Sequence, residues 1–200
     1  MRNINKIVLL IFSIIIFSCS NNGKPSPRAI HLNDKAMEIL MENGDMSEEQ
    51  IDEGLRLLDE ATTIEPDYQL AYWNKMSFLF KKKDYNRLLE TNQEVQRLMK
   101  EPEPYLLVQK GMIYEIKGDS SKSKLLYKKG IALYDSIISV DTSKGFDYKV
   151  LYLDVLTMAN QGERAKKEFE KLKIKFPEKE FIEHFELRSK EQLLEEKTDY

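Results

Sequence analysis

Apolar side chains recur every three or four residues over most of this chain, and the clearest case runs from Leu70 to Met99. Residues with this spacing share one face of an α-helix, so each half of the stretch predicts a helix with one apolar face. The sequence Lys83-Asp84-Tyr85 interrupts the pattern and predicts a turn between the two helices. Two helices of about a dozen residues cannot bury both apolar faces by themselves, so the chain must supply neighbouring helices.

The same spacing predicts an all-α fold, because no segment alternates with a period of two for long. About nine helices are predicted, over residues 30–43, 47–64, 70–82, 85–100, 105–117, 120–138, 148–161, 164–176 and 180–196. Ser47 with Gln50 predicts a capping box, and Pro104 predicts a first helical turn. Three glycines are expected at helix exits: Gly44, Gly118 and Gly162.

The first 19 residues have the pattern of a targeting segment. Arg2 and Lys6 precede an almost unbroken apolar run over residues 7–17. That run is shorter than the roughly 20 residues that a helix needs to span a bilayer, so residues 1–18 are expected to form a cleaved signal peptide. The alternative is an uncleaved N-terminal anchor in which Cys19, the one cysteine of the chain, is an incidental thiol.

The boundary Ile16-Phe17-Ser18-Cys19 resembles the cleavage site of a bacterial lipoprotein. The resemblance implies that Cys19 carries diacylglycerol on its sulfur and a fatty acyl chain such as palmitate on its amine. Ser20 resembles the residue found in lipoproteins that are sorted to an outer membrane. We therefore expect a lipid-anchored protein of the cell envelope, at the outer membrane and facing the periplasm. Residues 19–29 would be the lipidated cysteine with a flexible tether, and residues 30–200 the helical domain.

Two segments, residues 71–85 and 107–119, resemble the first helix and turn of a tetratricopeptide repeat. Repeats counted in this way begin near residues 30, 69, 104 and 148, at intervals of 39, 35 and 44 residues. The motif itself has about 34 residues. The resemblance implies a right-handed α-solenoid of about four helix pairs, closed by a capping helix over residues 180–196. An unrelated helical bundle with accidental periodicity is the alternative.

The repeat register assigns packing roles to small and aromatic residues. Small residues are expected where two helices approach closely, at Ala61, Gly111, Gly130 and Ala165. Tyr114, Tyr127 and Phe169 would fill the adjoining space. Lys75 and Lys110 depart from the motif, which has leucine at this position. In the capping helix we expect Phe181, Ile182 and Phe185 to face the repeats, and Lys190 to lie on another side of the helix.

Residues typical of catalysis are scarce. His184 lies between Glu183 and Glu186, but adjacent helical residues point in different directions, so these side chains are poor metal ligands. No glycine-rich phosphate loop, nucleophile elbow or paired-histidine zinc motif is present. With 31 basic and 34 acidic residues, the chain also lacks the charge expected for nucleic-acid binding. We expect neither an enzyme, a cofactor nor a metal site.

In tetratricopeptide proteins the first helix of each repeat lines a concave groove that binds peptides. By position, the resemblance implies that the groove here is lined by Leu70, Trp73, Ser77, Phe80, Lys81, Tyr105, Val108, Met112, Glu115, Ile116, Lys149, Tyr152, Leu156 and Asn160. Many of these side chains are aromatic or aliphatic, which favours an apolar segment of a protein partner. Alternatively, Trp73 and Phe80 pack inside the array, against the N-terminal helix.

Two functions remain open at this point. The first is a lipid-anchored scaffold that binds a protein or peptide partner in the cell envelope. The second is a lipoprotein that binds a small molecule or cell-wall fragment for a neighbouring transporter or enzyme. A long open groove would favour the first, and a closed pocket with converging polar groups the second.

Overall fold

The computed structural model describes residues 24–41, 46–99, 101–140, 146–177, 187 and 189–198. Throughout these residues the regular elements are helices, so the predicted all-α class is confirmed. The helices are α2 (Pro27–Met41), α3 (Glu48–Ile64), α4 (Gln69–Lys81), α5 (Tyr85–Leu98), α6 (Pro104–Ile116), α7 (Ser120–Val140), α8 (Phe146–Met158), α9 (Gly162–Lys175) and α11 (Lys190–Thr198). The expectations for the signal peptide, Cys19, Gly44 and residues 181–186 lie outside the described residues.

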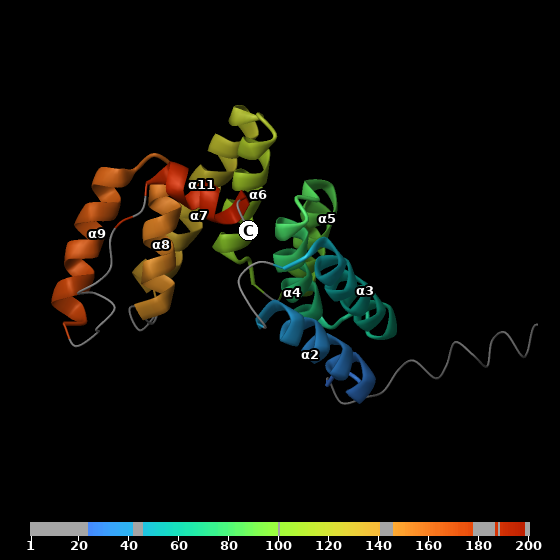
Figure 1. Ribbon diagram of the computed structural model, residues 1–200. Helices are drawn as coiled ribbons and strands as arrows, with labels where there is room; N and C mark the ends of the chain where they lie inside the picture. Colours follow the sequence, from blue (N-terminus) through green and yellow to red (C-terminus); the bar gives the residue numbers. More distant parts are fainter. Residues whose placement is uncertain are drawn as a thin grey trace, which may run out of the picture.

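The helices pack mainly as consecutive pairs: α2 with α3, α4 with α5, α6 with α7, and α8 with α9. Figure 1 shows these pairs following one another across the molecule, from the blue α2 to the orange α9. The red α11 leaves this order and lies against both α4 and α8. The last helix is therefore packed across the middle of the molecule and not only against its immediate predecessor.

Most helix ends lie close to the predicted positions, because local side chains fix them. The predicted capping box is present: Gln50 N donates to Ser47 Oγ at 3.3 Å, and Ser47 N donates to Gln50 Oε1 at 2.9 Å. Pro104 is the first residue of α6, as predicted. The start of α2 differs, because the helix begins at Pro27 and not at residue 30. Ser26 Oγ accepts a hydrogen bond from Ala29 N at 3.3 Å, so the expected tether ends before this serine-capped turn.

One backbone turn ends α4, α6 and α8. A residue with positive φ follows each helix: Lys83 at 58°, Gly118 at 80° and Asn160 at 59°. In each case the next residue donates its N–H to the carbonyl of the third residue from the helix end: Asp84 to Leu79 at 3.0 Å, Asp119 to Tyr114 at 2.7 Å, and Gln161 to Leu156 at 2.8 Å. This is the bond of a Schellman motif. The three helix pairs therefore share one type of turn, and its left-handed position is a glycine only at Gly118.

Gly162 does not have the role predicted for it. It is the first residue of α9, and the left-handed position after α8 belongs to Asn160. Asparagine adopts this conformation more readily than most residues, because its short polar side chain can bond locally. The glycine pattern alone therefore placed the helix exit two residues too late.

Glycines allow close contact between neighbouring helices. A Cβ atom on Gly111 of α6 would lie 2.6 Å from Cε1 of Tyr127 of α7. A Cβ atom on Gly130 of α7 would lie 2.7 Å from Cγ2 of Val108 of α6. Both contacts confirm the close approach predicted for Gly111 and Gly130. Gly54 was not singled out from the sequence, yet a Cβ atom there would lie 2.1 Å from Cε1 of Phe78.

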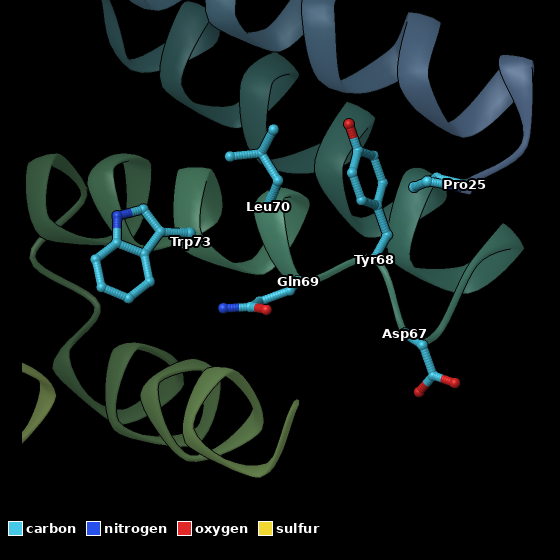
Figure 2. A pocket seen from close by; sticks show the side chains of 6 residues that line it. All are labelled: Pro25, Asp67, Tyr68, Gln69, Leu70 and Trp73. Atoms are coloured by element: carbon cyan, nitrogen blue, oxygen red, sulfur yellow. The ribbon is translucent and has the colours of Figure 1, made fainter. Parts of the chain in front are cut away.

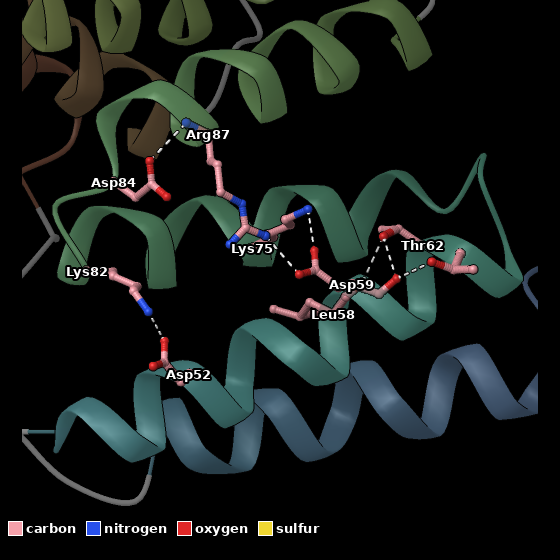
Figure 3. A network of polar contacts seen from close by, with 9 residues as sticks. Asp52, Leu58, Asp59, Thr62, Lys75, Lys82, Asp84 and Arg87 are labelled. Carbon is pink, nitrogen blue, oxygen red and sulfur yellow. Dashed lines mark hydrogen bonds and ion pairs between the residues drawn. The ribbon is translucent and has the colours of Figure 1, made fainter.

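Lys75 departs from the repeat motif because it forms an ion pair. Its amine lies 2.6 Å from Oδ1 of Asp59 on α3, and its side chain is mostly buried. Arg87 of α5 donates to the other carboxylate oxygen of Asp59 at 2.8 Å. Figure 3 shows Asp59 between these two cations, with Lys82 paired to Asp52 nearby. One carboxylate on α3 thus contacts both helices of the next pair.

The buried apolar residues form two main clusters. The first joins α2 to α5 and includes Phe78 and Leu58, and the second joins α6, α7, α8 and α11 around Tyr134 and Leu156. The first cluster also includes Leu106 and Ile113 of α6. Both clusters therefore contain residues of α6, the helix at which the two halves of the molecule meet.

A buried amide contact connects α5 to α6 at this junction. Asn92 Nδ2 donates to the side-chain oxygen of Gln109 at 2.6 Å and to the carbonyl of Leu106 at 3.1 Å. Both amide side chains are buried. The two halves are thus joined by directional hydrogen bonds as well as by apolar packing.

The predicted helix over residues 180–196 is wrong at its centre, since Leu187 and Ser189 are not helical. Ser189 starts a new helix: its Oγ accepts from Gln192 N at 3.2 Å, and its own N donates to Gln192 Oε1 at 2.7 Å. Lys190 is also not at the surface, since its side chain is 14% exposed. Its position depends on a residue of α6, which local periodicity cannot reveal.

Candidate partner-binding surface

A hollow of about 550 Å³ lies at the start of α4. It is lined by Pro25, Asp67, Tyr68, Gln69, Leu70 and Trp73. In Figure 2 the side chains of Leu70 and Trp73 project from the first turns of α4, and Pro25 comes from the segment before α2. Leu70 is 52% exposed and Trp73 is half-buried. The hollow therefore presents apolar side chains to solvent beside the polar groups of Asp67 and Gln69.

Trp73 connects this hollow to the next helix pair. Its ring lies 6.2 Å from the ring of Tyr105, centroid to centroid, at an angle of 33°. This separation is within the range of favourable aromatic pairs. Tyr105 is the second residue of α6 and is also half-buried. Two of the predicted groove residues, from the first helices of successive pairs, are thus brought together.

Glu115 is the polar centre of the surface further along α6. Its Oε2 accepts a hydrogen bond from the Tyr127 hydroxyl at 2.7 Å, and its Oε1 lies 2.5 Å from the amine of Lys190. The Lys190 amine also lies 5.4 Å from the centroid of the Tyr127 ring, a cation–π distance. Burial raises the pKa of Tyr127, and the hydrogen bond to the Glu115 carboxylate raises it further.

Leu193 of α11 is buried in the second apolar cluster. It is 5% exposed and belongs to the buried cluster that also contains Val108, Met112 and Tyr152. Three predicted groove residues are therefore core residues in the free chain. Phe80 is likewise buried, in the cluster formed by α2 to α5, which agrees with the alternative for this residue.

The predicted groove residues thus fall into three groups. Leu70, Ser77 and Asn160 are exposed. Partly exposed are Trp73, Lys81, Tyr105, Glu115, Ile116 and Lys149. Buried are Phe80, Val108, Met112, Tyr152 and Leu156. In the free chain, only the first two groups present side chains that a partner can contact without displacing part of the protein.

Tyr152 also takes part in a polar contact that the sequence did not reveal. Its hydroxyl donates to Asp135 Oδ1 of α7, and Arg164 of α9 lies 2.6 Å from the same oxygen. Burial raises the pKa of Tyr152, with Asp135 as a further cause. The three residues are far apart in the sequence, so no local motif marks them.

A second, smaller hollow of about 180 Å³ lies between α8 and α9. It is lined by Ile138, Lys149, Tyr152, Glu168, Lys171, Leu172 and Lys175. Burial lowers the pKa of the Lys149 amine, and so does the neighbouring Lys175 amine. The lining combines apolar side chains with three lysines and one acid, and Lys171 pairs with that acid, Glu168, at 2.7 Å. The positive charges of Lys149 and Lys175 suit a small anionic molecule better than a long peptide.

Within the described ranges, no group of three histidine, cysteine or acidic residues is placed to hold a metal ion. His31 is exposed on α2, and His184 lies outside those ranges. Across the part of the chain that the structure describes, no helix is long and apolar enough to cross a membrane.

Comparison with known proteins gives no relative: no protein-family model matches the chain, and no curated protein matches it. The case for a function therefore rests on the residues and contacts described above.

Proposed function

We propose that this protein is a lipid-anchored scaffold of the tetratricopeptide type, which holds a protein or peptide partner in the bacterial cell envelope. The observation that carries the proposal is the turn shared by α4, α6 and α8, with positive φ at Lys83, Gly118 and Asn160. A turn repeated at the end of alternate helices, together with the packing of the helices in consecutive pairs, supports a structural repeat. The close approaches at Gly111 and Gly130 add support, because the repeat motif has small residues at both places.

In this proposal the helix pairs form a right-handed solenoid with α4, α6 and α8 on its inner face. Trp73 and Tyr105 support this arrangement, since residues assigned to the inner face on α4 and on α6 contact each other. Half-buried aromatic side chains are frequent anchors of protein interfaces. The exposed Leu70 next to Trp73 extends the apolar surface. The partner would therefore bind with apolar side chains against α4 and α6.

The lipid anchor is proposed from the sequence around Cys19. Its test is metabolic labelling with an alkyne analogue of palmitate in a bacterial host. The wild-type chain should take up the label and fractionate with the outer membrane, whereas Cys19→Ala should do neither. Ser18→Ala, which keeps a small residue before the cysteine, is the matched control and should still be labelled. An unlabelled wild-type chain would contradict the proposal.

Partner binding is tested by crosslinking in intact cells followed by purification of the tagged full-length chain. The comparison is between Leu70→Ala and Leu125→Ala, because the two leucines are 52% and 53% exposed and lie on different helices. Loss of one defined envelope protein with Leu70→Ala and Trp73→Ala, but not with Leu125→Ala, is the expected result. Equal recovery in all three variants would exclude this surface.

The hollow lined by Lys149, Lys171 and Lys175 favours a second candidate function, the binding of a small anionic molecule or cell-wall fragment. Its test is a thermal-shift screen of acidic cell-wall fragments. A fragment that stabilises the wild-type chain should lose its effect in Lys149→Met. Lys166→Met, on an exposed lysine of α9, should respond like the wild type.

A further inference from the structure

The chain's last described helix lies on the surface that we propose for the partner. α11 contacts α4 and α8, and its first residue, Lys190, binds Glu115 of α6. These are the three helices whose side chains form the proposed inner face. We propose that α11 is a removable occupant of this face, and that the partner is a short helix with the same pattern: a lysine followed by leucine three and four positions later. This inference rests on the proposed function and specifies its partner.

The contacts of α11 show what such a helix must present. Lys190 and Glu115 are 14% and 26% exposed, so their ion pair is largely removed from water. Leu193 follows Lys190 by one helical turn and is buried, in the cluster that also contains Val108 and Met112. Residues three and four apart lie on one face of a helix, so Lys190, Leu193 and Leu194 point to the same side. The surface thus recognises a cation and an adjacent apolar pair.

α11 is too short to be stable by itself. It has nine residues, fewer than the roughly 12–15 that an isolated helix needs to be stable in water. Its leucines are Leu193 and Leu194, and Glu191 and Gln192 are exposed. The order of α11 therefore depends on its contacts with the rest of the protein, among them the Lys190–Glu115 ion pair and the packing of Leu193 and Leu194, and a helix with the same pattern can make these contacts in its place.

Helix α6 connects the exposed hollow to the residue that Lys190 binds. Trp73 contacts Tyr105 at the start of α6, and Val108, Met112 and Glu115 follow on the same helix. Release of α11 would uncover the Glu115 carboxylate and apolar side chains of the cluster to which Leu193 belongs, while Leu70 is already open to solvent. A helix lying in an apolar groove is a common mode of peptide recognition.

α11 and its site belong to one chain, which makes the competition strong. A segment joined to its site acts at an effective concentration of the order of millimolar. A free peptide at micromolar concentration therefore cannot displace α11 unless the internal contact is weakened. In Lys190→Glu the internal helix carries an acid opposite Glu115 and should leave the site, while the site itself is unchanged.

The test uses the full chain in detergent and fluorescent peptides with the sequence of residues 189–198. Fluorescence anisotropy should show the wild-type peptide binding to the Lys190→Glu chain at least tenfold more tightly than to the wild-type chain. The Glu115→Lys chain should reject the wild-type peptide and bind the Lys190→Glu peptide. Lys122→Glu is the matched control, because Lys122 pairs with Asp119 on exposed α7 surface, and it should behave as wild type. Equal weak binding to the wild-type and Lys190→Glu chains, both folded by circular dichroism, overturns the proposal.

Hydrogen exchange on the wild-type chain gives an answer that does not depend on the variants folding. The amides of α11 should exchange at least 100-fold faster than those of α8. Equal protection would make α11 a fixed part of the core and overturn the inference. Light scattering of the Lys190→Glu chain tests whether a second copy of the chain occupies the site. A doubled mass would show exchange of α11 between two copies and would exclude a partner helix.

The two proposals fail separately. If the peptide exchanges with α11 while no envelope protein is captured through Leu70 and Trp73, α11 is still a removable occupant and the scaffold function is excluded. A partner that depends on those residues, with no peptide exchange, would leave the scaffold and remove the role of α11.

Discussion

The amine of Lys190 lies 2.5 Å from the carboxylate of Glu115, and this ion pair joins α11 to α6. The other oxygen of the same carboxylate accepts the hydroxyl hydrogen of Tyr127, so one acidic side chain connects three helices. Both partners hold the carboxylate in one orientation. The position of α11 therefore depends in part on a tyrosine of α7, whose ring also lies 5.4 Å from the Lys190 amine.

Removal of the Tyr127 hydroxyl should weaken this connection. Tyr127→Phe keeps the ring that packs against Gly111 but loses the hydrogen bond to Glu115, so we expect a loss of about 1–2 kcal/mol in the free energy of unfolding. Urea unfolding followed by circular dichroism measures it. Tyr114→Phe, on a partly exposed ring, is the control and should change stability by less than about 0.5 kcal/mol. Equal effects of the two changes would contradict the role of Tyr127.

Gly54→Ala should destabilise the protein by about 1–3 kcal/mol, because the new Cβ atom would lie 2.1 Å from the buried ring of Phe78. Gly162→Ala is the matched control, since a Cβ atom there meets nothing within 4 Å. It should be neutral or stabilise the protein by up to about 1 kcal/mol, through a lower entropy of the unfolded chain. Thermal melts of both variants measure the difference. Equal melting temperatures would show that α3 and α4 are not packed in this register.

Lys83→Gly should stabilise the protein by about 1 kcal/mol, because Lys83 has φ of 58° and glycine adopts this region without a steric cost. Lys83→Ala separates the backbone effect from the loss of charge and should bring no gain, since alanine keeps the Cβ atom. Chemical denaturation of the two variants checks the prediction. A gain of the same size for alanine would assign the effect to the charge.

Stability should fall above pH 10. Burial raises the pKa of Tyr148 to about 12, and it also raises the pKa values of Tyr127, Tyr134 and Tyr152 above the ordinary value near 10. A raised pKa in the folded state means that the folded chain keeps protons which the unfolded chain loses. The stabilising contribution is therefore complete below pH 10 and is lost as the pH rises through 10–12 and above.

The slope of this loss should be about 1.4 kcal/mol per pH unit for each tyrosine that stays protonated only in the folded state. Melting temperatures between pH 8 and 12 measure it, with absorbance at 295 nm reporting ionised tyrosine. Tyr134→Phe removes one of the buried hydroxyls and should make the decline less steep. A melting temperature that is constant up to pH 12 would contradict the burial of these hydroxyls.

Local features of the sequence were sufficient for most helices and for several of their ends. Ser47 with Gln50 and Pro104 act on residues within one helical turn, so their roles could be predicted. The turn at Asn160 was displaced in the prediction, because the expected glycine lies two residues away and asparagine does not mark a left-handed turn reliably.

The candidate site was predicted less completely, because its contacts join residues that are distant in the sequence. Trp73 and Tyr105 were assigned to one surface by the repeat register, and their rings do meet. Lys190 was expected to lie away from the repeats, but it binds Glu115 of α6. Local periodicity could not show this contact, because the two residues belong to different helices. Val108 and Met112 were assigned to an open groove, and the periodicity of α6 could not show that Leu193 lies in the same cluster.

The contact of Asn92 with Gln109 has a consequence for the shape of the molecule. The hydrophobic effect has no preferred direction, whereas an amide hydrogen bond of 2.6 Å requires a defined distance and direction. A buried amide pair at the junction of α5 and α6 therefore sets the angle between the first and second halves of the chain. Trp73 belongs to the first half and Tyr105 to the start of the second, so the same amide pair determines how wide the gap between these two rings can open.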